Sequence, residues 1–373
     1  MHYLMINLPF AGHTNPTLPL VRELVRRGHR VTYVNAEPFR QRIEAAGAEF
    51  QPFLDFPAAP SEQEKKEQCF RAAFETALSL PGPFDALIYE MFFYPGFELA
   101  QRKKLPCVRQ FSQPAWSEET WAQAPAVFKL SAKLIDRQVL NRQAARSLGL
   151  RTYGLHDGII GSRPDMNIVY LPASFQGCRE SFDDTYLFFV PTPEAVPSDT
   201  VIPYEQMTGP IIYISLGSII SNRGFCHECI RAFGNKPFSV ILNTGKVPPD
   251  SLGKIPDNIF AYSFVPQLEV LAHADVFLTH CGMNSINEAL YQAVPMVAMP
   301  FLNDQLTNAR RIVDLGLGKR VRSFPSRGKE LYRAVCEVYE DAQIKQNVAG
   351  ISDELRRQAD WDGVIARIEA LCE

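Results

Sequence analysis

Residues 276–288 read VFLTHCGMNSINE, and this stretch decides the fold that we expect for the chain. Residues 276–279 are apolar, with branched and aromatic side chains, so they predict a buried strand. A turn over residues 280–284 then leads into a helical pattern that begins near Ser285. A strand that passes through a short turn into a helix is typical of the βα units of a parallel sheet.

The same alternation of strands and helices continues on both sides of this stretch. Further strands are expected at residues 3–8, 31–35, 86–89, 107–111, 211–216, 239–243 and 296–299. Helical periodicity occurs at residues 18–27, 38–46, 62–80, 96–103, 225–233, 267–272, 285–293, 304–315 and 327–340. Strands separated by helices of this length imply parallel crossovers, so we expect α/β sheets covered by helices on both faces.

A proline-rich stretch divides these elements into two domains. Residues 191–210 contain five prolines, which remove backbone hydrogen-bond donors and interrupt regular structure. We therefore expect a Rossmann-like N-terminal domain at 1–195, a linker at 196–210 and a Rossmann-like C-terminal domain at 211–350, facing each other across a cleft. The helical pattern of residues 351–373 is long enough to cross back to the first domain.

Composition and charge argue against several classes of protein. Of the 373 residues, 46% are hydrophobic and 21% are charged, which is ordinary globular usage. A net charge of −3 gives no electrostatic reason to expect nucleic acid or an anionic membrane as a partner. No apolar run reaches the roughly 18 residues of a membrane-spanning helix. Eight scattered cysteines and the lack of a basic leader segment favour reduced thiols in the cytoplasm.

The residues after the strand at 276–279 are expected to bind an anion. Ligands of open parallel sheets bind beyond the carboxyl ends of the strands, often at the start of a helix. The N–H groups there are unpaired and partly positive, and His280, Asn284 and Ser285 would add side-chain donors. Glu288 follows one turn later, where its carboxylate can accept hydrogen bonds from a ribose diol. With the turn Gly217-Ser218 after a neighbouring strand, these residues predict a nucleotide site.

A second candidate site lies in the first domain. Residues 9–16 read PFAGHTNP and follow the first strand. Gly12 allows a tight turn there, Asn15 is the expected helix cap, and His13 would lie at the rim of the cleft. Histidine suits a general base because its usual pKa lies near neutrality. Glu90 closes an apolar strand and can orient the imidazole, although a capping loop with a solvated histidine is the competing interpretation.

Aromatic side chains of the first domain are candidates for an apolar acceptor pocket, with core packing as the alternative. They are Phe10, Phe92, Phe93, Phe111 and Trp116. No metal site is expected in either domain. The run Cys226-His227-Glu228-Cys229 lies on an expected helix and has no second cysteine pair at zinc spacing.

Residues 263–312 resemble the donor-binding signature of the family 1 glycosyltransferases, which are UDP-glycosyltransferases. Residues 265–275 match V-P-Q-x-x-V-L-x-H-A-D, residues 279–290 match T-H-C-G-x-N-S-x-x-E-A-L, and Asp304-Gln305 follow at the family's spacing. The segments AGHTNP at 11–16 and RGHRVTY at 27–33 agree as well. The resemblance extends over nearly the whole chain and is strongest to bacterial macrolide and natural-product glucosyltransferases. It implies the two-domain GT-B fold.

The resemblance also implies a role for each matching residue. The UDP-sugar would be bound by Ser218, Phe264, Val265, Gln267, His280, Gly282, Asn284, Ser285, Glu288, Asp304 and Gln305. Among these, Phe264 would stack on uracil, the Val265 backbone would hydrogen-bond the base, and Gln267 would lie beside the nucleoside. The residues at 280–285 would hold the diphosphate with Ser218, Glu288 the ribose, and residues 304–305 the sugar.

The implied reaction is an inverting transfer without a metal or other cofactor, in which the UDP-sugar is a co-substrate. His13 would deprotonate the acceptor, and Glu90 stands where the family commonly has an aspartate partner for the histidine. Glucose is the favoured sugar, with galactose, N-acetylglucosamine and glucuronic acid as alternatives, and the acceptor would be a natural product, macrolide or phenol. Two other functions remain open: a UDP-sugar 2-epimerase, and a non-catalytic helper of glycosyltransferase ancestry.

Overall fold

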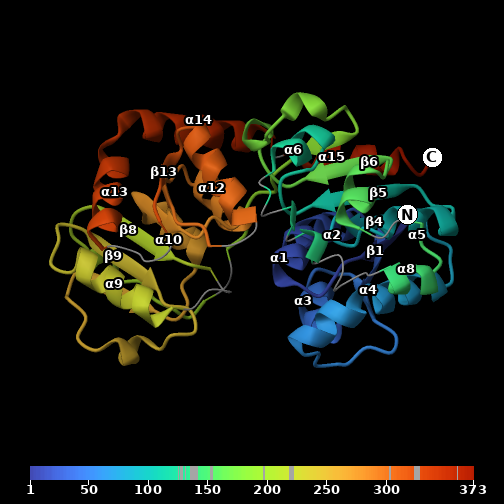
Figure 1. Cartoon of the computed structure of the whole chain (residues 1–373), viewed down its shortest axis with the longest axis horizontal. Coiled ribbons are helices and arrows are strands. Elements are labelled where there is room, and N and C mark those ends of the chain that lie inside the picture. Colours follow the sequence, from blue (N-terminus) through green and yellow to red (C-terminus); the bar gives the residue numbers. More distant parts are fainter. Residues whose placement is uncertain are drawn as a thin grey trace. The chain divides into compact units, whose positions relative to one another are not determined.

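The computed structural model describes the chain except for residues 125, 127–128, 131, 135–141, 152–153, 196–197, 218–221, 302–303, 323–327 and 359. The described residues form two compact units (Figure 1). The first unit comprises Met1–Pro191 together with Asp360–Glu373, and the second comprises Thr192–Ala359. Each unit contains one parallel sheet with helices, so the α/β class predicted from the sequence is confirmed.

The sheet of the first unit has seven strands in the order β3-β2-β1-β4-β5-β6-β7. The strands are β1 His2–Ile6, β2 Arg30–Asn35, β3 Glu49–Pro52, β4 Ala86–Glu90, β5 Cys107–Phe111, β6 Met166–Val169 and β7 Tyr186–Phe188. The described helices are α1 Ala11–Thr14, α2 Leu18–Arg26, α3 Arg40–Ala45, α4 Glu62–Ser79, α5 Gly96–Lys103, α6 Glu118–Gln123 and α8 Arg142–Ser147, with α15 Trp361–Glu369 from the end of the chain. Every residue of β4 and β5 is buried, as expected for central strands of a covered parallel sheet.

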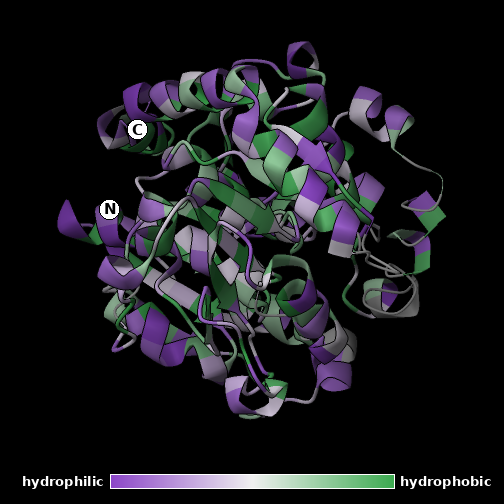
Figure 2. Cartoon of the chain, turned by 90° about the vertical axis from the view of Figure 1, so that its left-hand side faces the viewer, coloured by the Kyte–Doolittle hydropathy of each residue, from purple (hydrophilic) through white to green (hydrophobic). Residues whose placement is uncertain are grey.

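The sheet of the second unit has six strands in the order β10-β9-β8-β11-β12-β13. The strands are β8 Ile211–Ser215, β9 Ser239–Asn243, β10 Ile259–Tyr262, β11 Val276–Thr279, β12 Met296–Ala298 and β13 Gly318–Arg320. The described helices are α9 Arg223–Phe233, α10 Gln267–His273, α11 Met283–Tyr291, α12 Asp304–Asp314, α13 Gly328–Glu340 and α14 Ala342–Gln358. Figure 2 shows hydrophobic colour along strands of the interior, whereas the helices carry both hydrophobic and hydrophilic residues.

Both sheets follow the same winding rule, which places their candidate sites. In each sheet the chain first builds outward in one direction, from β1 to β3 or from β8 to β10. It then returns and adds the next strand on the other side of the first one, so β4 pairs with β1 and β11 pairs with β8. Ligands of such sheets bind at this switch point, beyond the carboxyl ends of the two central strands.

The C-terminal segment differs from the single helix expected over residues 351–373. Helix α14 ends at Gln358 in the second unit, and a separate helix, α15, begins after Asp360. The Asp360 carboxylate accepts hydrogen bonds from the Asp362 and Gly363 N–H groups and so starts the new helix. Val364, Ile365 and Ile368 of α15 are buried in the core of the first unit.

Local structure also differs from expectation around the first strand. Gly12 makes no tight turn, because residues 11–14 form the short helix α1, which runs through a 3₁₀ turn at Asn15–Thr17 into α2. Asn15 is the C-cap of α1 and does not start the following helix α2, whose N-cap is Thr17; its Oδ1 accepts a hydrogen bond from Arg42 Nη1 at 3.1 Å. The helix expected near Ser285 begins two residues earlier, at Met283.

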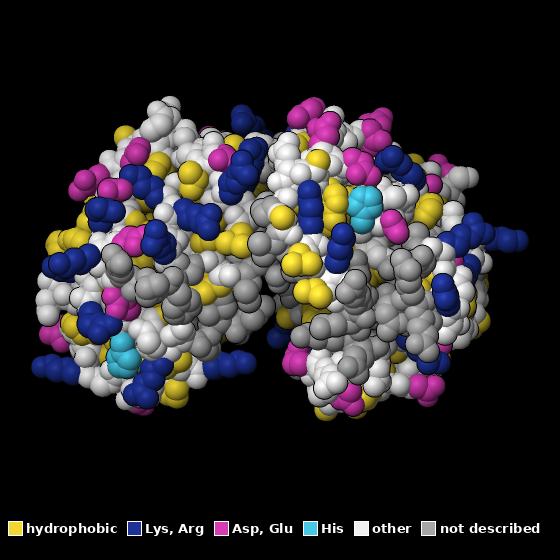
Figure 3. Space-filling model, in the orientation of Figure 1, with side chains coloured by type: hydrophobic (Ala, Val, Ile, Leu, Met, Phe, Trp, Pro, Cys, Tyr) yellow, Lys and Arg dark blue, Asp and Glu magenta, His cyan; other side chains and the backbone are white. Residues whose placement is uncertain are grey.

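Hydropathy and charge characterise the helices and the surface of the molecule. Among the described residues, no helix combines the length and the hydropathy that crossing a bilayer requires. On the face drawn in Figure 3, basic and acidic side chains are interspersed over the coloured surface rather than gathered by sign.

Candidate active site

His13 and Glu90 meet at the switch point of the first unit. His13 lies in α1, the first helix after β1, and Glu90 is the last residue of β4, the neighbouring strand. His13 Nδ1 lies 3.1 Å from Glu90 Oε1. The fold holds the histidine from its backbone as well, because Asn7 Nδ2 donates a hydrogen bond to the His13 carbonyl at 2.9 Å. The pairing suggested by the two strand ends is therefore present in the structure.

A third residue, Ser112, completes this arrangement. Ser112 follows β5, which pairs with β4, and its Oγ lies 2.8 Å from His13 Nδ1 and 2.7 Å from Glu90 Oε1. Glu90 is fully buried, and its second oxygen, Oε2, accepts a hydrogen bond from the Phe92 N–H at 2.9 Å. A buried carboxylate needs such donors, since an unpaired charge is costly to bury. The His13 side chain remains 17% exposed, which leaves the imidazole accessible.

The five aromatic candidates for an acceptor pocket separate into two groups. Phe10 and Phe92 are partly buried and lie beside His13, with ring centroids 6.4 and 4.4 Å from the imidazole. Phe93 and Phe111 are fully buried, so they belong to the core and present no surface to an acceptor. For these two residues the structure favours the alternative, core packing, because Phe93 packs against Phe70 and Phe111 lies under the Arg109 guanidinium.

Trp116 takes part in a different aromatic contact. Its side chain is 9% exposed, and its ring lies 5.8 Å from that of Trp121 in an edge-to-face arrangement. The ring of Trp121 in turn lies 5.3 Å from that of His156. A ring contact with Trp121 of α6 is thus described for Trp116, and its part in an acceptor pocket stays a prediction.

His280 occupies the switch point of the second unit, directly after β11. Its ring lies so close to Gly217 and Gly282 that a Cβ atom at either glycine would come within 2.6 Å of it. Burial lowers the pKa of His280 to about 4, because desolvation disfavours the imidazolium form. Its Nδ1 is buried and has no hydrogen-bond partner among the described residues. His280 is thus a neutral imidazole fixed between two glycines.

Gln267 joins the residues expected to bind the nucleoside. Its Nε2 donates to Glu288 Oε2 at 2.6 Å and to Ser285 Oγ at 3.2 Å, which links the start of α10 to α11. The hydroxyl of Tyr213 on β8 donates to Gln267 Oε1 at 3.0 Å and so fixes the orientation of the amide. Burial raises the pKa of Glu288, and the hydrogen bond from Gln267 partly opposes that rise. The carboxylate is therefore both desolvated and oriented.

Asp304 and Gln305 open helix α12, after β12. Asn308 Nδ2 donates to the Cys281 carbonyl at 3.0 Å and lies 3.5 Å from Asp304 Oδ2, so it ties α12 to the turn that contains His280. Gln305 Oε1 accepts a hydrogen bond from the Phe301 N–H at 2.9 Å. The two predicted sugar-binding residues therefore lie on an element that is anchored to the central turn.

The remaining predicted residues of the second unit differ in exposure. The Phe264 side chain is 51% exposed, whereas Val265 is buried and offers only its backbone. Asn284 is exposed in the first turn of α11, and Gly282 immediately precedes that helix. Ser218 lies outside the described residues.

Sequence reasoning missed three residues that hold these groups in place: Ser112, Tyr213 and Asn308. Ser112 follows a strand that was predicted, so the rule that found Glu90 would also have found it. Asn308 lies four residues after Asp304, a spacing that places two side chains on one face of a helix. The sequence gives no indication of a role for Tyr213, since it lies inside an apolar strand and its hydroxyl bonds to Gln267 on a different element, α10.

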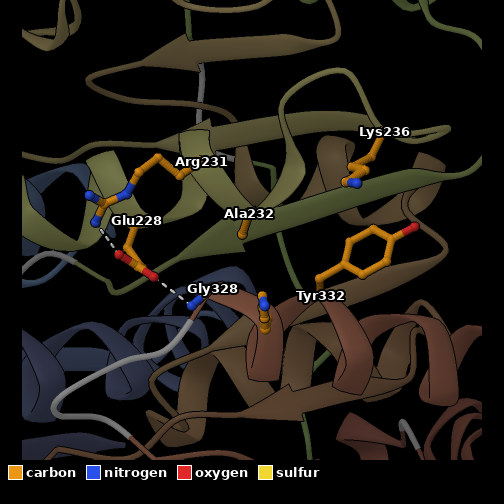
Figure 4. Close-up of a pocket in the computed structure, with 7 residues that line it drawn as sticks. Glu228, Arg231, Ala232, Lys236, Gly328 and Tyr332 are labelled. Atoms are coloured by element: carbon orange, nitrogen blue, oxygen red, sulfur yellow. Dashed lines mark hydrogen bonds and ion pairs between the residues drawn. The ribbon is translucent and has the colours of Figure 1, made fainter.

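Two other features lie away from the predicted residues. Within the described chain, one group could converge on a metal ion: Glu119, Cys178 and Glu180 of the first unit, whose candidate ligand atoms lie within 4.8 Å of one another. In the second unit, a hollow of about 580 Å³ lies beside α9 and α13 (Figure 4). It is lined by Glu228, Arg231, Ala232, Lys236, Gly328, Lys329 and Tyr332. Neither feature contains a residue of the expected donor or base sites.

The fold and the two switch-point sites define a class of protein, the glycosyltransferases of the GT-B fold. A glycotransferase of kitacinnamycin has a solved structure that matches 100% of this chain and 99% of its own, with a TM-score of 0.84 and 26% identity. The structure of CalG4, the calicheamicin glycosyltransferase, matches 99% of this chain and 98% of its own, with a TM-score of 0.78 and 26% identity. The predicted fold is confirmed by these matches.

Sequence comparison then identifies the family. The profile of the UDP-glucoronosyl and UDP-glucosyl transferases matches residues 198–358. NDP-glycosyltransferase YjiC of Bacillus subtilis is 30% identical over 99% of this chain and 97% of its own length. Oleandomycin glycosyltransferase of Streptomyces antibioticus is 26% identical over 99% of this chain and 90% of its own length. The chain belongs to the UDP-glycosyltransferase family and is a glycosyltransferase, as the sequence resemblance predicted.

Proposed function

We propose that this enzyme transfers a hexose, with glucose favoured, from a UDP-sugar to a hydroxyl of a small and largely apolar acceptor, with inversion at the anomeric carbon. The observation that carries the proposal is the arrangement of His13, Ser112 and Glu90 at the switch point of the first unit, in a chain that belongs to this family. A histidine whose Nδ1 faces a buried carboxylate has the design of a general base.

In the proposed reaction the acceptor oxygen attacks the anomeric carbon as His13 Nε2 takes its proton. The new carbon–oxygen bond forms while the bond from the sugar to the diphosphate breaks, and UDP leaves on the opposite face. Glu90 stabilises the imidazolium through the contact at Nδ1. A positioned general base typically contributes about 10²–10⁴-fold to the rate. Phe10 and Phe92, beside the imidazole, offer apolar surface to the acceptor.

The donor is proposed to bind to the second unit. The exposed ring of Phe264 can stack on uracil, and Glu288, oriented by Gln267, can accept hydrogen bonds from the ribose hydroxyls. The start of α11 and the backbone around Gly217 would meet the diphosphate, because unpaired N–H groups attract negative charge. Since burial lowers the pKa of His280 to about 4, its contribution there would be a neutral hydrogen bond.

Asp304 and Gln305 are proposed to bind the hydroxyls of the transferred sugar. They open α12, which Asn308 ties to the central turn. We propose that no metal is needed, because the unpaired N–H groups at the start of α11 are hydrogen-bond donors suited to the diphosphate. For the acceptor, the names of the relatives and of the similar structures, which include oleandomycin and calicheamicin, support a natural-product class such as a macrolide, with a phenol as an alternative.

The test is to incubate the protein with UDP-glucose and a panel of phenols and macrolides. Mass spectrometry would detect a product glycoside, and NMR would give its anomeric configuration. A β-glycoside from the α-linked donor supports the proposal. An epimerised nucleotide sugar would instead indicate an isomerase, and UDP binding without any product, for every sugar donor offered, would indicate a helper protein.

A further inference from the structure

We infer that Ser112 is a positioning residue of the base, a hydroxyl bridge that passes the orienting effect of Glu90 to His13. This inference rests on the proposed role of His13 as the base. It concerns a residue that the family signature does not contain and that reached the site only through the pairing of β4 with β5.

The three polar atoms form a small triangle with unequal sides. Ser112 Oγ lies 2.7 Å from Glu90 Oε1 and 2.8 Å from His13 Nδ1, whereas the direct separation of Nδ1 and Oε1 is 3.1 Å. The two shorter sides both involve the serine hydroxyl. The path through Ser112 is therefore the better-formed connection between the carboxylate and the imidazole.

The chemistry of the three groups sets the direction of both hydrogen bonds. An ionised carboxylate only accepts, and a serine hydroxyl has one hydrogen to donate and lone pairs to accept with. Ser112 donates its hydrogen to Glu90 Oε1. The hydroxyl can then only accept from His13, so Nδ1 must carry the hydrogen. The neutral histidine is thereby held in the tautomer whose Nε2 is the basic nitrogen.

The surroundings show why the carboxylate benefits from a bridge. Glu90 is fully buried, and its Oε2 is held by the Phe92 N–H at 2.9 Å, which fixes the plane of the carboxylate. Ser112 is 3% exposed and lies just beyond β5, so the bridge is shielded from water. With Ser112 in place, Glu90 Oε1 is contacted by Ser112 Oγ and His13 Nδ1, while Oε2 stays bonded to the Phe92 N–H.

The alternative is that Ser112 only satisfies the buried carboxylate and plays no part in orienting His13. The two possibilities differ in how Ser112→Ala combines with His13→Ala. If Ser112 acts through the imidazole, Ser112→Ala lowers turnover in the parent enzyme and has no further effect once His13 is alanine. If Ser112 only provides a hydrogen bond to the buried Glu90 carboxylate, Ser112→Ala lowers turnover in the parent and in the His13→Ala variant alike. It then also lowers the stability of the fold.

The experiment compares Ser112→Ala with Ser112→Thr, which restores a hydroxyl, and with Ser162→Ala as the control. Ser162 is also buried in the first unit, where its hydroxyl donates to the Gly158 carbonyl and accepts a hydrogen bond from Arg109 Nη1. Turnover would be measured with UDP-glucose and a phenol acceptor. Calorimetry with UDP would report on the second unit, and thermal melting on folding. Loss of an outer group of this kind typically costs about 10–100-fold, so we expect kcat to fall by that factor while KM changes less than about threefold.

A second readout does not depend on activity. Nitrogen-15 NMR of the His13 imidazole distinguishes the two neutral tautomers. We expect the Nδ1-protonated form in the parent and in Ser162→Ala, and a mixture of tautomers in Ser112→Ala. Ser112→Thr should restore most of the turnover and the single tautomer, provided that it melts like the parent.

Three outcomes would overturn the inference. They are an unchanged tautomer in Ser112→Ala, turnover within twofold of the parent, and an equal further loss in the His13→Ala background. If His13→Ala abolishes turnover while Ser112→Ala has no effect, the proposed base survives and the bridge alone is wrong. If His13→Ala keeps near-normal turnover, both the base and the bridge are wrong.

Discussion

His13 and His280 both lie at the switch points of two sheets of the same winding, His13 after β1 and His280 after β11, and their surroundings differ completely. His13 faces a buried carboxylate and a hydroxyl, with 17% of its side chain exposed. His280 is enclosed by two glycines, and burial lowers its pKa to about 4. A histidine near a carboxylate can hold a proton at Nδ1 and exchange another, whereas a desolvated one stays neutral. The switch point of a sheet therefore indicates where a site lies, and the residues around each histidine determine its chemistry.

The largest expected effect separates the two histidines by substitution. His13→Ala should lower turnover by at least about 100-fold, because the general base is lost, while the affinity for UDP stays within about twofold. Steady-state kinetics and calorimetry would measure these two quantities. His227→Ala, which changes a partly buried histidine of α9, is the matched control and should leave both unchanged. Near-normal turnover in His13→Ala would show that His13 is not the general base, and the proposed difference in chemistry between His13 and His280 would be wrong.

The second effect concerns the sugar end of the donor site. Asp304→Ala should weaken use of the UDP-sugar by about 10–100-fold, the loss expected for hydrogen bonds that a charged group accepts, with little effect on UDP itself. Competition binding of UDP-glucose and UDP would measure the difference. Asp314→Ala, at the other end of α12, is the control for changes to the helix. Equal weakening of both ligands would contradict a sugar-binding role for Asp304.

A smaller effect tests the desolvated carboxylate. Burial raises the pKa of Glu288, so the ionised side chain costs folding free energy. Glu288→Gln keeps an acceptor for Gln267 but removes the charge, so UDP affinity should fall by about tenfold. A gain of about 1 kcal/mol in stability would raise the melting temperature by about 2–4 °C. Asp353→Asn, an exposed carboxylate of α14, should change neither quantity. A lower melting temperature in Glu288→Gln would argue against a desolvation cost.

The smallest effect is the pH dependence that His280 imposes on the second unit. Its pKa is about 4 in the folded protein against 6.5 ordinarily, so the unfolded state binds more protons between these values. Stability therefore falls as the pH drops through this range, by about 1 kcal/mol between pH 7 and pH 5.5. Thermal melting of the parent and of His280→Asn without ligand would show a steeper loss in the parent. Parallel pH profiles would mean that His280 titrates normally.

Much of the fold followed from local patterns. Strand β11 and helices α5 and α10 were predicted because the hydrophobic pattern that defines each of them lies entirely within its own residues. Strands β3, β6, β7, β10 and β13 were not predicted. Of these, β3 and β13 are short and polar, reading EFQP and GKR, and are held by pairing at a sheet edge. Pairing partners far away in the sequence leave no local signal.

The candidate site was predictable to the extent that its residues follow strands. His13 and His280 follow strands and Glu90 ends one, and the structure places each at a switch point. Tyr213 was not predictable, because its role depends on a hydroxyl reaching Gln267 from another element. For Phe93 and Phe111 the sequence left both core and pocket open, because the choice depends on which way a side chain turns.

The break between α14 and α15 has a consequence for how the polypeptide matures. Because Val364, Ile365 and Ile368 fill the core of the first unit, that unit is built from two separate pieces of chain. During synthesis, its apolar surface beneath α15 stays uncovered until the ribosome has made the whole second unit. Domains generally fold as they emerge from the ribosome, but the first unit cannot complete its core until the second unit has been synthesised. During this delay chaperones could bind its exposed hydrophobic surface.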